Sequence, residues 1–311
     1  MKKYGFGVDV GGTTCKLGLM ELSGVLLEKW EINTDVSNGG KEILKDIARE
    51  IENKLHEMNI DKYDVCGIGM GVPGPVLKER IVNRCINLGW GVIDIAYEME
   101  KLTGLPVKVE NDANLAALGE MWKGSAEGAS DVIMVTLGTG VGSGIIINGN
   151  IISGAAGGAG EIGHVLVNEN ETDVCSCGKK GCLEQYVSAT GIVRMAKKQI
   201  CNHPESVLTK KAELSAKDIF DAAKDGDDFA MNLTEQFGVI LGTALANVSC
   251  VLNPESIVIG GGVSNAGHII IESLEKVFYE RTFHACRNAK ISLAMLGNDA
   301  GIYGGVRLVM K

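Results

Sequence analysis

Short apolar runs alternate, along the first part of the chain, with segments in which apolar residues recur every three or four positions. The short runs predict strands at 4–10, 16–20, 25–33, 65–70 and 107–109. The periodic segments predict helices at 40–58, at 92–103 and from residues 110–112 to about 122. Strands that alternate with helices are typical of an α/β architecture, which is therefore the class predicted for this part.

The same kind of pattern restarts after Gly124. Strands are predicted at 131–137, as a pair within 145–152, at 256–259 and at 290–296, with a turn over 138–144 between the first two. Helices are predicted at 189–201, at 215–225 with Ser215 as N-cap, at 227–252, at 267–282 and from about 299. We therefore expect two α/β domains, one over 1–122 with the C-terminal helix 299–311 and one over 123–298.

Two glycine- and threonine-rich turns share one plan. The segments DVGGTTCKLGLM (9–20) and TLGTGVGSGIII (136–147) both read as strand, turn, strand. Such turns expose backbone N–H groups, which can bind phosphate oxygens, so the pair predicts a nucleotide held in a cleft between two similar halves. Two ordinary tight hairpins would give the same pattern. Neither segment fits a P-loop or a dinucleotide-binding fingerprint.

Composition narrows the class of partner. The chain has 311 residues and a formal net charge of −9, which argues against a nucleic-acid-binding face. The sequence has no apolar run long enough to predict a membrane span. It also begins without the pattern of a secretory signal, so we expect a cytoplasmic protein.

The segment from Gly160 to Glu184 carries the densest candidate chemistry. His164, Cys175, Cys177 and Cys182 lie within it and have the residue types of a structural Cys3His zinc site. A disulfide is the alternative, but nine cysteines and an expected reducing compartment favour metal. The metal would hold the loop, and with it Glu161 and Glu184, as one wall of a polar pocket.

Asp112 is the candidate catalytic base. It follows a predicted strand and opens a predicted helix, where the helix dipole favours an ionised carboxylate that could accept a proton from a bound hydroxyl. Alternatively, Asp112 or Asn111 is only an N-cap. Asn111, Asp112, Glu161 and Glu184 together supply the amide and carboxylate groups that bind sugar hydroxyls. Asp9, at the end of the first strand, could hold Mg²⁺ through water or simply form the turn.

These residues stand in motifs that resemble the ROK family of sugar kinases and repressors, most closely its bacterial glucokinases. The motifs are DVGGTTCKLG (9–18), GVPGPV (71–76), NLGW (87–90), VENDANLAALGE (109–120), TLGTGVGSGI (136–145), GAAGGAGEIGH (154–164), CSCGKKGCLE (175–184) and GGGVS (260–264). The resemblance implies an α/β, two-domain, actin-like, hexokinase-type ATPase (ribonuclease H-like) fold with an inter-domain cleft. It also implies a kinase that uses ATP and Mg²⁺, contains a structural Zn²⁺, and forms a homodimer or homotetramer.

The resemblance assigns roles to particular residues. Asp112 would be the base on the 6-hydroxyl of a hexose, with glucose expected, and Asn111, Glu161, His164 and Glu184 would contact the sugar. His164, Cys175, Cys177 and Cys182 would bind zinc. The expected nucleotide contacts are Asp9, Gly11, Gly12, Thr13, Thr14, Lys16, Gly138, Thr139, Gly140, Gly260, Gly261 and Gly262.

Three other functions remain open at this point, and one of them is a non-catalytic binding module stabilised by zinc, against which the paired phosphate turns argue. The family's repressors carry an N-terminal helix-turn-helix, and we expect none here because the first strand begins at Tyr4. Another sugar could replace glucose, namely fructose, allose, mannose, N-acetylglucosamine or N-acetylmannosamine, and polyphosphate could replace ATP.

Overall fold

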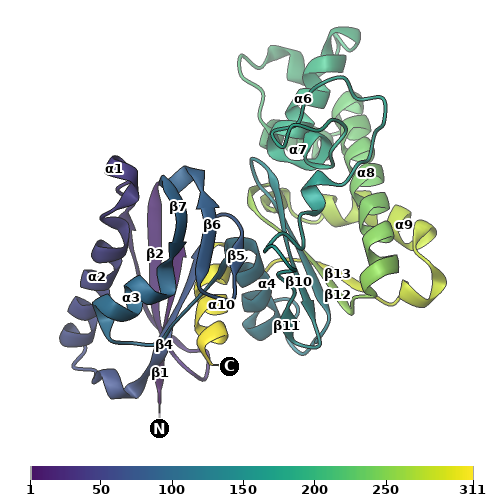
Figure 1. Cartoon of the computed structure of the whole chain (residues 1–311). Coiled ribbons are helices and arrows are strands. Elements are labelled where there is room, and N and C mark those ends of the chain that lie inside the picture. Colours follow the sequence, from purple (N-terminus) through teal and green to yellow (C-terminus); the bar gives the residue numbers. More distant parts are fainter. Residues whose placement is uncertain (1, 311) are drawn as a thin grey trace.

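The computed structural model describes residues 2–310, which form two lobes, each built on a five-stranded sheet (Figure 1). The first sheet has the order β3-β2-β1-β4-β8 and the second β11-β10-β9-β12-β13. The first contains β1 (Tyr4–Val10), β2 (Thr14–Glu21), β3 (Leu26–Asn33), β4 (Val65–Val72) and β8 (Val107–Asn111). The second contains β9 (Val132–Leu137), β10 (Val141–Ile147), β11 (Asn150–Ile151), β12 (Ser256–Gly260) and β13 (Lys290–Leu293).

The two sheets repeat one plan. In the first, β1 pairs antiparallel with β2 and parallel with β4. In the second, β9 pairs antiparallel with β10 and parallel with β12. The two glycine-rich turns join the antiparallel pair in each sheet, so the predicted repeat of strand, turn and strand is present in both lobes.

The helices cover the sheets and fill the space between them. The first lobe carries α1 (Ser37–Gly40), α2 (Ile43–Glu57) and α3 (Ile95–Thr103). The second carries α5 (Glu184–Val187), α6 (Ala189–Gln199), α7 (Ala216–Lys224), α8 (Asp228–Leu252) and α9 (Ile269–Arg281). Ser215 caps α7 through a reciprocal capping box with Asp218, as the sequence predicts for the start of this helix.

Helices α4 (Asp112–Lys123) and α10 (Ala300–Val309) lie between the sheets (Figure 1). Their backbones approach closely because glycine leaves room: a Cβ at Gly119 would strike the carbonyl oxygen of Ala300, and one at Gly304 that of Leu115. Buried side chains of α4 pack with the second sheet, whereas those of α10 pack mainly with the first. The division into 1–122 with 299–311 and 123–298 therefore stays a proposal, with α4 as the element shared by both lobes.

Helix α8 has the length and composition of a membrane span, but it serves as a core helix. Phe229, Leu233, Phe237, Leu241 and Leu245 on this helix belong to the large apolar cluster of the second lobe. Burial on this scale accounts for its apolar character without a bilayer.

Some element boundaries differ from the predicted ones. The helix expected at 92–103 begins at Ile95, because residues 90–94 form β7 (Trp90–Asp94), and Asp94 caps the helix by accepting a hydrogen bond from the Tyr97 amide. Strand β7 completes a small sheet with β5 (Val76–Leu77) and β6 (Ile81–Cys85), which the sequence pattern did not predict.

The turn expected over 138–144 ends at Gly140, because Gly142 and Gly144 belong to β10. Helix α4 packs directly against this strand: a Cβ at Gly144 would lie 2.6 Å from the carbonyl oxygen of Ala113. Glycine here marks a close approach between a helix and a strand, and not a turn.

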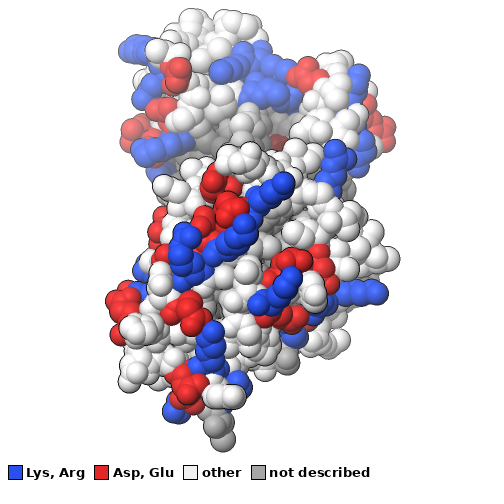
Figure 2. All heavy atoms as spheres, turned by 60° about the vertical axis from the view of Figure 1, so that its left-hand side comes forward, with Lys and Arg blue, Asp and Glu red and all other residues white. Residues whose placement is uncertain are grey.

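Charges of both signs are mixed over the first lobe, on the face shown in Figure 2. Surface pairs of this lobe include Lys45 with Glu42 and Arg49 with Asp46 on and beside α2. The prediction from net charge that the protein does not bind nucleic acid stays a prediction.

Candidate functional site

A cavity of about 810 Å³ lies between the two lobes. Residues at the carboxyl ends of β1 and β8 line it from the first lobe, and the glycine-rich turn after β9 lines it from the second. All five residues expected to contact a sugar line this cavity: Asn111, Asp112, Glu161, His164 and Glu184. The fold thus brings together groups that are up to 73 positions apart in the sequence.

The start of α4 separates the capping residue from the candidate base. Asn111 is the N-cap, and its Oδ1 accepts hydrogen bonds from the amides of Ala113 (2.9 Å) and Asn114 (3.3 Å). Asp112 Oδ1 also accepts from the Ala113 amide, at 2.8 Å, while the side chain remains open to the cavity. Because Asn111 takes the capping role, Asp112 is available for chemistry.

The environment of Asp112 favours the protonated form of its carboxyl group more than solvent does for an ordinary Asp. The surrounding protein displaces much of its hydration, and the negative charge of Asp9 lies nearby, so its pKa is raised to about 6. The Ala113 amide opposes this shift by stabilising the charged form. A carboxylate with a pKa near the working pH is suited to general base catalysis.

Glu110 is a buried carboxylate that the sequence analysis did not select. Its Oε1 accepts from the amide of Asn111 (2.8 Å) and from Asn114 Nδ2 (3.1 Å), and its Oε2 accepts from Ser153 Oγ (2.8 Å). Ser153 begins the glycine-rich loop that leads to Glu161. Glu110 therefore ties the end of β8 to the loop of the other lobe, and its place in VENDAN was the only sequence signal for it.

Hydrogen bonds from the backbone and from the cysteine motif hold Glu184 at the edge of the cavity. Its Oε2 accepts from the Val141 amide at 3.0 Å, and its Oε1 accepts from Ser176 Oγ at 2.9 Å. Ser176 stands between Cys175 and Cys177, so the cysteine motif and this carboxylate are directly linked.

The four predicted metal ligands gather at one place. The ligand atoms of His164, Cys175, Cys177 and Cys182 all lie within 4.8 Å of one another. Cys175 Sγ is 3.7 Å from His164 Nδ1, and Cys177 Sγ is 3.6 Å from Cys182 Sγ. In a tetrahedral zinc site, Zn–S and Zn–N bonds of about 2.3 and 2.0 Å put ligand atoms about 3.5–3.8 Å apart. The donor set and the spacing therefore fit zinc bound through Nδ1 of the histidine.

The two predicted phosphate turns are both present as hairpin turns. In the first, the Gly11 amide donates to the Thr14 carbonyl at 3.0 Å. In the second, the Gly138 amide donates to the Gly140 carbonyl at 3.0 Å, and Thr190 Oγ1 donates to the Thr139 carbonyl at 2.8 Å. The second turn is thus hydrogen-bonded to the start of α6.

Only some of the residues expected to contact the nucleotide line the cavity. Its wall includes Asp9, Lys16, Gly138, Gly140, Gly261 and Gly262. Within the described chain, its wall does not include Gly11, Gly12, Thr13, Thr14, Thr139 or Gly260. Gly260 is the buried last residue of β12, where a Cβ would lie 2.8 Å from the Met134 side chain.

Several polar residues of the cavity wall were missed by the sequence analysis: Asn87, Ser264, Asn265 and Asn298. Ser264 is the last residue of the motif GGGVS and Asn265 is the next one, so assigning the whole motif to the site and extending it by one residue would have found both. Asn298 lies after β13 in a short 3₁₀ helix (Gly297–Asp299) with no motif of its own, and only the fold brings it to the cleft.

The first lobe also contributes the carboxylate of Asp9, which is paired with Lys16. Lys16 Nζ lies 4.0 Å from Asp9 Oδ2 at the cavity wall. Burial raises the pKa of Asp9, and the positive charge of Lys16 partly opposes this. A carboxylate at this position fits a magnesium ion, which prefers oxygen ligands and retains water.

Fold and site together define a two-lobed α/β protein with a polar cleft and a Cys3His cluster at the cleft's edge. The chain belongs to the ROK family, whose family model matches residues 5–311. The α/β hexokinase-type fold predicted from the motifs is confirmed by the solved structures that it matches.

Individual relatives add detail. The chain is 44% identical to a glucokinase from Halalkalibacterium halodurans over 98% of its own length and 94% of that protein's. It also matches the crystal structure of a ROK family glucokinase from Streptomyces griseus in complex with glucose and AMPPNP, at 32% identity and a TM-score of 0.77, over 98% of both chains. A xylose repressor from Caldicellulosiruptor bescii is 31% identical over 98% of this chain and 77% of the repressor.

Proposed function

We propose that this protein is a hexose kinase that transfers the γ-phosphate of ATP to the 6-hydroxyl of glucose. The observation that carries the proposal is the meeting of Asp112 with Asn111, Glu161, His164 and Glu184 on one cavity that Gly138, Gly140, Gly261 and Gly262 also line. The relatives support it, since the glucokinases are more similar to this chain than the repressor is.

The residues of the chain would act as follows. Asp112 accepts the proton of the sugar hydroxyl as that oxygen attacks phosphorus. Asn111, Glu161 and Glu184 hydrogen-bond the other hydroxyls and orient the ring. With Nδ1 of His164 on zinc, Nε2 is left for a sugar hydroxyl, so the metal would fix the tautomer of the ring. Asp9 would hold Mg²⁺ through water, and that ion supplies charge neutralisation at the phosphates.

Kinase assays with a panel of sugars test this proposal. In a coupled assay of ADP release, we expect glucose to have the highest kcat/KM among the common hexoses, their N-acetylated amino forms and xylose. A preference for another hexose would overturn the choice of glucose only. Absence of ADP release with every sugar, and of product with polyphosphate, would overturn the kinase assignment. A gel shift with DNA is expected to be negative, and specific retardation would favour a repressor.

Asp112 predicts the pH dependence of the reaction. The base acts in its charged form, and its pKa of about 6 lies above that of an ordinary Asp. We therefore expect kcat/KM for the sugar to be level above pH 7 and to fall about tenfold per pH unit well below 6. Initial rates at low sugar concentration between pH 5 and 9 measure this. A profile that stays level down to pH 5 would exclude Asp112 as the titrating base.

A further inference from the structure

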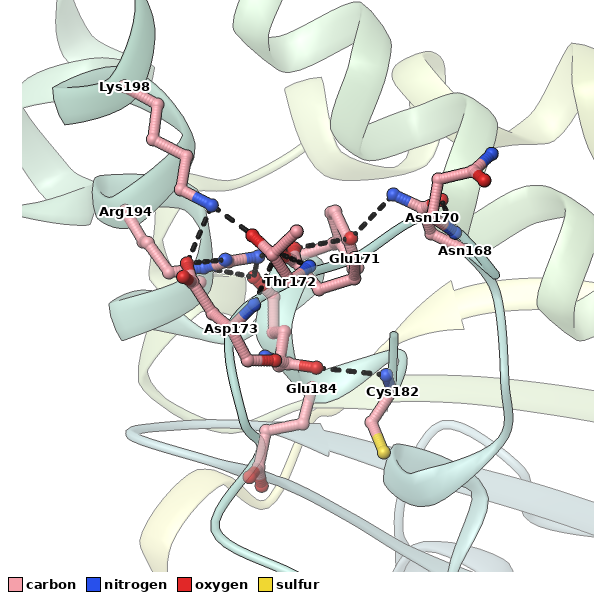
Figure 3. A network of polar contacts seen from close by, with 12 residues as sticks. Asn168, Asn170, Glu171, Thr172, Asp173, Cys182, Glu184, Arg194 and Lys198 are labelled. Carbon is pink, nitrogen blue, oxygen red and sulfur yellow. Dashed lines mark hydrogen bonds and ion pairs between the residues drawn. The ribbon is translucent and has the colours of Figure 1, made fainter. Parts of the chain in front are cut away.

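An ionic cluster joins the metal loop to α6 (Figure 3). The metal loop is defined as residues 164–182, from the first to the last candidate ligand. The ionic cluster consists of Glu171 and Asp173 on this loop and Arg194 and Lys198 on α6. Arg194 Nη2 lies 2.8 Å from Glu171 Oε2, and Arg194 Nη1 lies 2.6 Å from Asp173 Oδ2. Lys198 contacts both carboxylates, at 3.3 and 2.6 Å.

Glu171 is the centre of the cluster. Its side chain is only 6% exposed, and the hydroxyl of Tyr186 donates to its Oε2 at 2.6 Å. The amides of Thr172 and Asp173 donate to its Oε1 at 2.9 and 3.0 Å. These donors, with Arg194 first among them, hold the pKa of Glu171 well below its usual range. A buried carboxylate with this many donors fixes the path of the chain around it.

Arg194 also reaches the chain beyond the last cysteine. Its Nε and Nη2 donate to the carbonyl oxygen of Gln185, at 3.2 and 2.9 Å. The Gln185 side chain joins the middle of the loop to its last residue, because its Nε2 donates to the Asp173 carbonyl and its Oε1 accepts from the Cys182 amide. One guanidinium thus fixes the segment before the first cysteine and the segment after the last one.

This second attachment bears on the sugar site through the residue beside it. Glu184, which lines the cavity, directly precedes Gln185 and opens α5. Its carboxylate points away from the ionic cluster in Figure 3. The backbone from which Glu184 projects is therefore held by Arg194 on one side, while its carboxylate contacts Ser176 of the cysteine motif on the other.

We propose that Arg194 and Glu171 are positioning residues that hold the metal loop and Glu184 in their binding geometry independently of the metal. The effect on sugar binding rests on the proposed kinase function, whereas the effect on the loop does not. Glu184 would contact the sugar in the ground state and in the transition state alike, so its displacement should raise KM more than it lowers kcat.

The test uses two conservative variants and a matched control. Glu171→Gln keeps the shape of the side chain and removes its charge, and Arg194→Lys keeps the charge and removes the planar fork. Asp221→Asn on α7 is the control, because it neutralises an exposed carboxylate of the same lobe that pairs with Lys217 and Lys224. Three quantities are measured: kcat and KM for glucose, the rate of zinc loss to a chromogenic chelator, and hydrogen exchange of loop amides.

We expect both cluster variants to raise KM for glucose and to speed zinc loss by about 10-fold or more, with kcat within about threefold of the parent. Amides of residues 172, 173 and 182 should exchange faster, also in zinc-depleted protein, and the control should match the parent in all readouts. Parental zinc loss and amide exchange in both variants would overturn the proposal.

The remaining outcomes are also decisive. If Glu171→Gln does not fold, Arg194→Lys alone decides, since it keeps the buried charge paired. A parent that phosphorylates no sugar would defeat the proposed function, while zinc loss and exchange would still decide the positioning role. If a cluster variant has the KM of the parent for glucose but faster zinc loss and amide exchange, the ionic cluster attaches the metal loop. The part of the proposal that the cluster positions Glu184 would then be wrong.

Discussion

Replacing Asp112 with Asn is expected to lower kcat by about 10²–10⁴-fold and to change sugar affinity by no more than a few-fold. The amide keeps the size of the side chain and can still accept the hydrogen bond from the Ala113 amide. It cannot take a proton from the sugar hydroxyl. Turnover by the coupled assay and sugar binding by calorimetry measure the two effects separately.

Asp61→Asn is the matched control for this experiment. Asp61 also begins a helical turn and accepts a backbone hydrogen bond, from the Tyr63 amide at 2.8 Å, but it does not line the cavity. Its turnover should equal that of the parent. If Asp112→Asn kept turnover within about tenfold of the parent, a barrier change of only ~1.4 kcal/mol, Asp112 would not be the base.

Those parts of the site that depend on local sequence could be predicted. The metal ligands lie within 19 consecutive residues, from His164 to Cys182, so residue type and spacing were sufficient to select them. Asp112 was selected because a strand and a helix meet at one residue, which is also a local pattern. What the sequence left open was whether Asp112 or Asn111 caps the helix, and only the side-chain hydrogen bonds decide that.

The parts that were missed depend on distant partners. In the sequence, Glu110 looks like one more strand residue. Its partner Ser153 is 43 positions away, and only the fold places the two side chains together. Arg194 and Lys198 look like ordinary basic residues in the last turns of an amphipathic helix, and their role follows from the packing of α6 against the metal loop. Residues 92–94 of β7 were predicted as helix, because pairing with the distant strand β6 decides their conformation.

Cys177→Ala is expected to release the metal and to weaken sugar binding. The thiol lies 3.6 Å from Cys182 Sγ and is the most exposed of the four candidate ligands, so its removal opens a closed site without leaving a void in the core. Three remaining ligands hold zinc far more weakly than four, and we expect the zinc content after dialysis against a chelator to fall from about one equivalent to near zero.

The sugar affinity of Cys177→Ala separates two ways of building the pocket wall. If zinc alone positions Glu184 and His164, KM for glucose should rise by about 100-fold or more, and if the ionic cluster shares the task the rise should be nearer tenfold. Cys201→Ala is the control, because Cys201 is an exposed cysteine that is not one of the candidate metal ligands. Full sugar affinity in a zinc-free preparation would contradict a structural role for the metal. A smaller rise in KM for Cys177→Ala than for Arg194→Lys would mean that the ionic cluster, and not zinc, is the main support of this wall.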